Sequence, residues 1–214
     1  MRKDERLKTI YETIAPHVTR SEGAWRDYLE FASKFFKYGF DNALLVYAQN
    51  PNVTMLAPTA VWNKIGRYVN KGATGIAVCE YENAKLTVKY LFDVTQTNGR
   101  NVVATNWALD EEMKTLLEQR LSYGHSIKSS GFEDAIRQVS YEAVIENLDD
   151  HLQNFQSDME NHIFESLPQD GLELQIQEII SDSVSYFVGK RCGLTDEEIE
   201  VRTGIATIAH FNTI

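Results

Sequence analysis

The sequence predicts an α+β fold in which a small antiparallel β-sheet packs with helices and is followed by a mostly helical, acidic part. Three observations support this prediction. Apolar residues recur at helical spacing over residues 2–49, apolar and polar residues alternate up to residue 94, and helical spacing returns from residue 110 onward. The chain has 214 residues, of which 43% are hydrophobic, so it is long enough to bury a core.

Three helices are predicted before the sheet, at residues 2–15, 22–38 and 41–49. A proline or a glycine follows each of them, at Pro16, Gly39 and Pro51, and both residue types end helices. In the second helix the large side chains fall on one face, which predicts that this face is buried. They are Trp25, Tyr28, Leu29, Ala32, Phe35 and Phe36.

The sheet is predicted from three short stretches. Residues 52–57 are expected to form a strand, and Pro58 to open a short helix. Residues 75–80 form a largely apolar run that is typical of a central strand. Residues 86–94 alternate between apolar and polar side chains, which indicates a long strand with one buried face. A turn at residues 82–84 joins these two strands, so an antiparallel hairpin is expected.

The second half is predicted to be helical, and the connector at residues 96–106 is the expected boundary between two domains, 1–100 and 101–214. Capping-box spacing, in which a Ser or Thr precedes a Glu by three residues, marks helix starts at Ser130 and Thr195. The expected helices cover residues 110–122, 132–147, 149–165 and 172–192.

Charge is distributed unevenly along the chain. Residues 1–100 carry 14 Lys and Arg against 10 Asp and Glu, whereas residues 101–214 carry 7 against 21. The first half therefore favours an anionic partner, while the second half also fits a set of solvated acidic helices. No apolar run approaches the roughly 18 residues of a membrane span, and the charged N-terminus lacks a secretory signal. The two cysteines are far apart in apolar surroundings, so buried thiols in a cytoplasmic protein are expected.

Known catalytic signatures are absent from the sequence. The patterns GxxxxGK[ST], GxSxG and HExxH do not occur, no GxGxxG follows a strand, and the cysteines have no neighbouring histidine signature. His151 and His162 lie about 16 Å apart on a continuous helix, which is too far to share one metal ion. We therefore expect no catalytic residue, no metal and no cofactor, and the chain is not predicted to be an enzyme.

The stretch from Trp62 to Val78 is the strongest functional lead, because it combines cations, aromatic rings and glycines. Non-specific binding of single-stranded DNA needs cations for phosphates and flat side chains that stack on bases. Trp62 and Tyr68 are the candidate stacking platforms, although Trp62 also fits a place in the core. Asn42 and Gln49 are expected to orient a loop or a base. The candidate phosphate contacts are Lys34, Lys37, Lys64, Arg67 and Lys71.

Residues 20–80 resemble a known domain. They contain, in order, an aromatic helix with a Trp, the pattern N-x-L-L-x-x-x-Q-x-P, a second Trp, and the pattern G-R-x-V-x-K-G-x-x-G-I. This order resembles the N-terminal domain of ArdC-type antirestriction proteins, a family associated with single-stranded DNA binding. The residues that carry the resemblance are Trp25, Asn42, Leu44, Leu45, Gln49, Pro51, Trp62, Gly66, Arg67, Val69, Lys71, Gly72, Gly75 and Ile76.

The later segments SDSVSYFVGKRCGL and HFNT resemble one branch of that family, found in large proteins of conjugative elements and prophages of Gram-positive bacteria. This resemblance implies a DNA-binding module of a mobile-element protein, with an antirestriction or DNA-processing role. It also implies a helicase or DNA methylase after Ile214, in the same polypeptide. ArdC-type proteins usually carry an HExxH helix, which is missing here, so protease activity is not implied.

Two other functions stay open. The acidic second half is suited to mimic DNA and to occupy a basic host defence protein, such as a restriction or CRISPR effector. Alternatively, the chain is a non-catalytic scaffold that docks a downstream enzyme.

Overall fold

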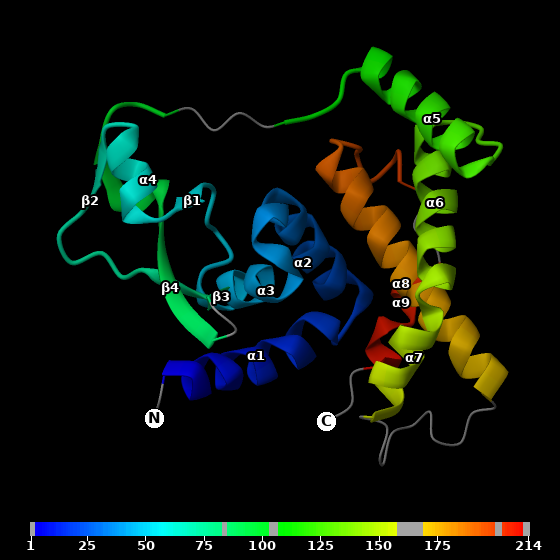
Figure 1. Cartoon of the computed structure of the whole chain (residues 1–214), viewed down its shortest axis with the longest axis horizontal. Coiled ribbons are helices and arrows are strands. Elements are labelled where there is room, and N and C mark those ends of the chain that lie inside the picture. The colour runs from blue at the N-terminus through cyan, green and yellow to red at the C-terminus, as the bar shows by residue number, and fades with distance from the viewer. Residues whose placement is uncertain (1–2, 83–84, 103–106, 158–168, 200–202, 212–214) are drawn as a thin grey trace. The chain divides into compact units, whose positions relative to one another are not determined.

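The computed structural model describes residues 3–82, 85–102, 107–157, 169–199 and 203–211, and they divide between two compact units. The α/β unit comprises residues 1–15 and 35–106, and the helical unit comprises residues 16–34 and 107–214. The first unit combines a small antiparallel sheet with helices and the second is helical, so the predicted α+β fold is confirmed (Figure 1). No helix of the described ranges is long and apolar enough to cross a membrane.

In its described residues, the α/β unit contains the first part of α1, two 3₁₀ turns, two further helices and five strands. Three of the strands form one antiparallel sheet in the order β1-β4-β3, and the other two pair antiparallel as β2-β5. The elements are α1 (Lys3–Thr19), η1 (Phe36–Tyr38), α3 (Gly39–Gln49), β1 (Leu56–Ala57), α4 (Thr59–Lys64), β2 (Arg67–Val69), β3 (Ile76–Glu82), β4 (Lys85–Asp93), η2 (Val94–Gln96) and β5 (Thr97–Gly99).

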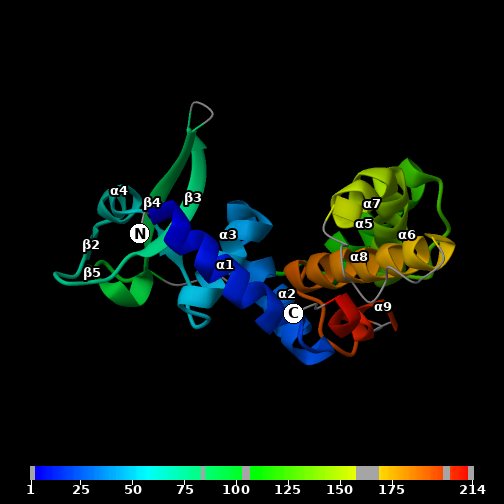
Figure 2. The same cartoon turned by 90° about the horizontal axis from the view of Figure 1, so that it is seen from below.

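The hairpin of β3 and β4 is the main sheet of this unit, and α3 packs along β3 (Figure 2). Ile76 pairs with Leu91 across the hairpin, and both are buried together with Val78 on the same face. The predicted hairpin is therefore confirmed. The β2–β5 pair was not predicted, because each of these strands has three residues, which is too few for an alternation of apolar and polar side chains to be visible in the sequence.

The carboxylate of Asp93 joins β1, β4 and the turn η2. Its side chain is 2% exposed and accepts four hydrogen bonds, from the amides of Thr54 (2.8 Å), Met55 (3.1 Å) and Thr95 (3.0 Å) and from the Thr95 hydroxyl (2.7 Å). Burial by itself raises the pKa of Asp93, but these donors outweigh it and hold the pKa below the ordinary 3.8. Asp93 is thus an ionised carboxylate in a buried place, held there by backbone and hydroxyl donors.

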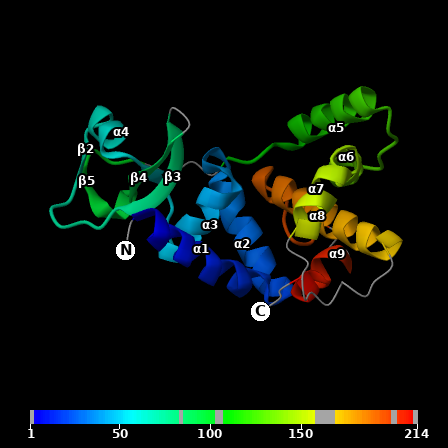
Figure 3. The same ribbon diagram turned by 60° about the horizontal axis from the view of Figure 1, so that its bottom comes forward.

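The helical unit is arranged around α8, which packs against α6, α2, α9 and α7 (Figure 3). The indole of Trp25 donates to the Ser183 hydroxyl at 2.9 Å and so ties α2 to α8. Gly204 lies so close to the Glu178 carbonyl that a Cβ there would meet it at 2.5 Å. The elements are α2 (Glu22–Lys34), α5 (Glu111–His125), α6 (Phe132–Glu146), α7 (Leu148–Ser157), α8 (Gln169–Arg191), α9 (Thr203–Ala206) and η4 (Ile208–Phe211).

Several boundaries differ from the predicted ones. Helix α1 continues through Pro16, and the predicted helix 22–38 ends at Lys34. Residues 16–34 cluster with the helical unit, although the sequence placed them in the first domain. The reason is that the apolar face of α2 packs on α8 and not on the sheet. Residues 158–165 of the predicted helix 149–165 lie outside the described residues.

The two predicted capping boxes have different outcomes. The Thr195 amide donates to the Glu198 carboxylate at 2.7 Å, and the Glu198 amide donates to the Thr195 hydroxyl at 3.3 Å. This capping box precedes a turn and not a longer helix. Ser130 instead bonds to Asp134, because Gly131 takes the cap position of α6. The cysteines, expected to be buried, are intermediate in exposure and both are free thiols.

The change Asp93→Asn tests the role of this carboxylate. An amide nitrogen would face N–H groups in place of an oxygen, so we expect a loss of about 2–3 kcal/mol in the free energy of unfolding at pH 7. Because the folded pKa of Asp93 is lowered, its stabilisation is complete above the unfolded value of about 3.8 and is lost as the pH falls through the folded pKa. The difference in the free energy of unfolding between wild type and variant should therefore be constant at neutral pH and become smaller in acid.

Urea denaturation between pH 7 and pH 2.5 measures this difference, and hydrogen exchange of the β4 amides assigns the loss to the α/β unit. Glu80→Gln is the matched control, because Glu80 is an exposed carboxylate on the same hairpin. The role given to Asp93 would be contradicted if both changes lowered the free energy of unfolding equally, or if the difference between wild type and Asp93→Asn did not become smaller in acid.

Candidate nucleic-acid interface

The β2–β5 pair forms a short ribbon with one exposed ring. Tyr68 is 59% exposed and lies directly opposite Asn98, which is also exposed. The Asn98 amide donates to the Asn70 side chain at 2.7 Å. Because side chains alternate along a strand, Arg67 and Val69 point to the other face of the ribbon. The Tyr68 ring is therefore accessible from solvent, and its role as a stacking platform stays a prediction.

The guanidinium of Arg67 holds the ribbon and the turn before it together. It donates to the Thr97 hydroxyl (2.7 Å), the Arg100 carbonyl (2.6 Å), the Thr97 carbonyl (2.7 Å) and the Val94 carbonyl (3.3 Å). These acceptors engage all three guanidinium nitrogens. The prediction that Arg67 contacts a phosphate is thus corrected, since its donors are already directed to the protein's own carbonyl oxygens.

The glycines of this stretch serve the chain's own turns. Gly66 has φ +78° where the chain turns from α4 into β2. Gly99 has φ +123°, and a Cβ there would lie 2.3 Å from the Gly66 carbonyl. Close approach of two backbone segments therefore explains Gly99, and it needs no ligand.

Trp62 is a core residue and not a stacking platform. Its side chain is 1% exposed, and the indole N–H donates to the Phe92 carbonyl at 2.9 Å. This hydrogen bond places the Trp62 side chain of α4 against the end of β4. A buried indole cannot stack on a base, so the prediction for Trp62 is corrected and the alternative of a core position is confirmed.

Asn42 and Gln49 cover the free edge of the sheet. The Asn42 amide accepts from the Cys79 N–H at 2.8 Å and donates to the Cys79 carbonyl at 2.7 Å. Gln49 does the same at Ala77, at 2.9 and 2.8 Å. Helix α3 thus presents two amides, seven residues apart, that pair with β3 as a neighbouring strand would. The prediction that they orient a base is corrected, because both ends of each amide are occupied.

Lys34 and Lys37 belong to different units. Lys34 lies at the end of α2 in the helical unit and pairs with Glu30 at 3.1 Å. Lys37 lies in η1 of the α/β unit and is exposed. Lys34 was predicted to contact a phosphate, but in the structure its ammonium pairs with a carboxylate of its own helix; for Lys37 the phosphate contact stays a prediction.

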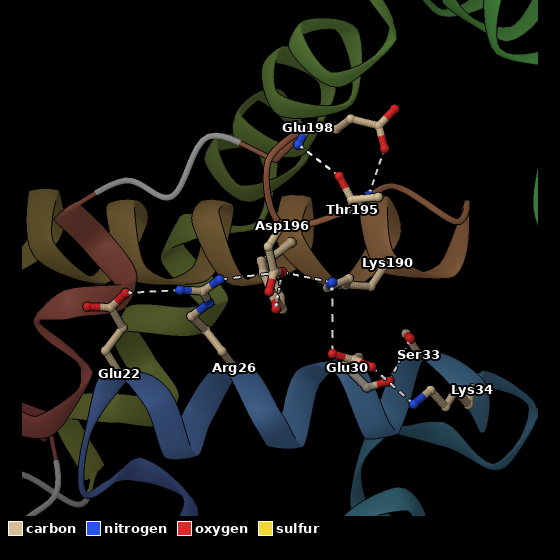
Figure 4. Close-up of polar contacts among 10 residues, drawn as sticks. Glu22, Arg26, Glu30, Ser33, Lys34, Lys190, Thr195, Asp196 and Glu198 are labelled. Atoms are coloured by element: carbon tan, nitrogen blue, oxygen red, sulfur yellow. Dashed lines mark hydrogen bonds and ion pairs between the residues drawn. The ribbon is translucent and has the colours of Figure 1, made fainter. Parts of the chain in front are cut away.

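Glu30 also belongs to a charged network between α2, α8 and the following turn (Figure 4). Lys190 pairs with Asp196 at 2.7 Å, and Arg26 approaches the same carboxylate at 3.4 Å. Lys190 lowers the pKa of Asp196, and the Tyr186 hydroxyl bonds to that carboxylate at 3.1 Å. Both cations also lie within 6 Å of the Tyr186 ring centre, at 5.3 and 5.7 Å. These charges hold the helical unit together.

Three of the nine predicted residues remain available around β2. Lys64 ends α4, which packs on β2, and Lys71 lies in the turn that follows β2, so the two lysines flank Tyr68 along the chain (Figure 1). Both are exposed, and neither forms an ion pair with a described residue. The sequence analysis missed Arg100, an exposed cation just after β5. Arg100 lies 33 residues after Arg67 in the chain, and it comes close to β2 only because β5 pairs with β2.

The described residues contain no group of three or more His, Cys, Asp or Glu side chains suited to a metal ion. No family model, curated protein or solved structure matches the chain. Among the described residues of the α/β unit, the exposed ring of Tyr68 is preceded in the chain by Lys64 and followed by Lys71, and both lysines are exposed.

The change Arg67→Lys tests the structural role of the guanidinium. A lysine has one nitrogen and cannot reach four acceptors, so we expect a loss of about 2 kcal/mol in the free energy of unfolding. Urea denaturation measures the loss, and hydrogen exchange at residues 94–100 locates it. Arg100→Lys makes the same chemical change at an exposed side chain and should cost less than about 0.5 kcal/mol. Equal effects at both positions would refute the anchoring role.

Proposed function

We propose that the α/β unit binds single-stranded DNA without base specificity through Tyr68, Lys64 and Lys71, with Arg100 and Lys37 as further cations. The observation that carries this proposal is the exposed Tyr68 ring on the β2–β5 ribbon, flanked by two lysines with no acidic partner among the described residues. A ring of this kind stacks on any base, and lysines neutralise phosphates of any sequence. The surface thus fits a ligand with splayed bases and a charged backbone.

Charge favours a local contact of this kind. Residues 35–106 carry seven Lys and Arg against four Asp and Glu, whereas residues 107–214 carry 7 against 21. The acidic helices repel a polyanion at long range, so bound DNA stays on the α/β unit. With few phosphates neutralised, the affinity should be modest and depend strongly on salt.

The sequence resemblance to the ArdC-type N-terminal domain supports the same function and suggests its setting. In that setting the chain is a non-catalytic module of a cytoplasmic protein from a mobile genetic element. It holds DNA that enters a cell as a single strand, and presents it to a helicase or methylase of the same polypeptide. This role would protect the entering strand and would count as antirestriction.

A second candidate rests on the acidic helices. Exposed carboxylates gather at the starts of α5 and α7, at Asp110, Glu111, Glu112, Asp149 and Asp150. Such a surface would suit a basic host defence protein that normally binds DNA. Binding to that protein without any affinity for oligonucleotides would favour this candidate over the first.

Binding of a fluorescent 20-nucleotide single strand at several salt concentrations tests the proposal. Tyr68→Ala should weaken binding by about 1–3 kcal/mol through the loss of one stacking partner. Lys64→Ala combined with Lys71→Ala should weaken binding to all sequences alike and reduce the slope of log K against log salt by roughly one to two. A duplex of the same length should bind more weakly, because its bases are not free to stack.

Lys34→Ala is the matched control, since Lys34 lies in the helical unit and pairs with Glu30. Its affinity should equal that of the wild type. If the wild type does not bind the strand, or if Lys34→Ala weakens binding as much as the double lysine change, the proposed site is refuted.

A further inference from the structure

Helix α5 of the helical unit has an apolar side that faces solvent. None of its residues is buried, and Met113, Leu116 and Tyr123 are 53%, 52% and 89% exposed. Together with Arg120 these residues follow the 3-4-3 spacing of a coiled-coil seam and lie on one stripe. Figures 1 and 3 show α5 at the edge of its unit, beside α6.

The opposite side of α5 is mostly polar, although it includes the half-buried Leu121, and it is engaged with its own unit. Lys114, whose side chain is 12% exposed, pairs with Glu111 at 2.8 Å and with Glu198 at 3.2 Å. Glu118 accepts a hydrogen bond from Ser129, whose hydroxyl also bonds to Ser122. Helix α5 therefore packs through its polar side and exposes its apolar side, which reverses the usual orientation of a surface helix. A gathered apolar surface of this kind marks an interaction site.

We propose that α5 pairs with α5 of a second copy of this chain, in antiparallel orientation. Glu112 and Arg120 border or belong to the stripe, both are exposed, and neither forms an ion pair with a described residue. An antiparallel pair centred near Leu117 brings Glu112 of each copy within about one helical turn of Arg120 of the other. A parallel pair would set each of these charges beside its own kind, so charge favours the antiparallel arrangement.

The pairing is expected to be weak, because one helix of 15 residues from each copy buries less surface than a standard stable interface. A reversible dimer that dissociates on dilution follows from this size. A second copy supplies an identical apolar stripe together with both complementary charges. A partner that is only acidic or only basic would complement just one of the two charges.

Sedimentation equilibrium of the full chain over a range of concentrations tests the pairing. The average mass of the wild type should rise above 24.4 kDa as concentration increases. Leu116→Glu should stay monomeric at every concentration, with an unchanged helical circular dichroism spectrum. Leu174→Glu is the matched control, because Leu174 is 53% exposed on α8 and should leave the dimer intact. A monomeric wild type, or a Leu116→Glu variant that dimerises equally well, overturns the proposal.

Charge exchange and cross-linking test the orientation. Glu112→Arg and Arg120→Glu should each weaken the dimer, and the double variant should restore it. In a chain with Cys79→Ser and Cys192→Ser, Leu116→Cys lies on the stripe within one residue of the two-fold axis and should form a disulfide with its own copy. Met113→Cys should not, because four residues of helix separate it from that axis. Failure of the double variant to restore pairing, or cross-linking at Met113→Cys as readily as at Leu116→Cys, overturns the antiparallel pair.

Discussion

The α/β unit depends on two opposite charges at either end of one short turn. Asp93 accepts N–H and hydroxyl donors before and within η2, and Arg67 donates to carbonyls within and after it. Between them they fasten β1 to β4 and β2 to β5 around residues 94–97. Each charge is satisfied by backbone dipoles and hydroxyls and not by the other charge, so it holds the chain without an ion pair. Arg67, the strand neighbour of Tyr68, is anchored in this way, so the backbone of β2 beside the exposed ring is tied to β5 and η2.

The same principle recurs at the edge of the sheet and in the helical unit. Two amides of α3 pair with the N–H and carbonyl groups of Ala77 and Cys79 at the edge of β3. In the helical unit, Lys190 and Arg26 share the carboxylate of Asp196 and the ring of Tyr186. At the sheet edge, polar side chains that the sequence pattern assigned to a ligand instead satisfy the fold. Among the exposed apolar groups of the described residues, the Tyr68 ring lies between two exposed lysines in the chain, and α5 carries three on one stripe.

Much of the fold could be predicted because it rests on local periodicity. The apolar spacing of α2 and α8 and the alternation of β4 are visible in the sequence, and the structure contains those elements. The candidate site could be predicted only in part. Tyr68, Lys64 and Lys71 are exposed and stay predicted contacts, whereas Arg67, Trp62, Asn42 and Gln49 are engaged by partners about 30 or more residues away in the chain. The sequence shows which residues can donate hydrogen bonds, but which acceptors they reach depends on the tertiary structure.

By itself, the sequence determined the order of the longer helices and strands, the uneven charge and the cluster of cations and rings near Trp62. Those features follow from composition and spacing, which act over one or two turns of helix or a few residues of strand. Only the tertiary structure decided which of those cations and rings face solvent, that α2 belongs with the C-terminal helices, and that α5 turns its apolar side outward. The physical reason is that burial and hydrogen-bond satisfaction depend on contacts between distant segments, and the same side chain serves the core or the surface according to what the fold places beside it.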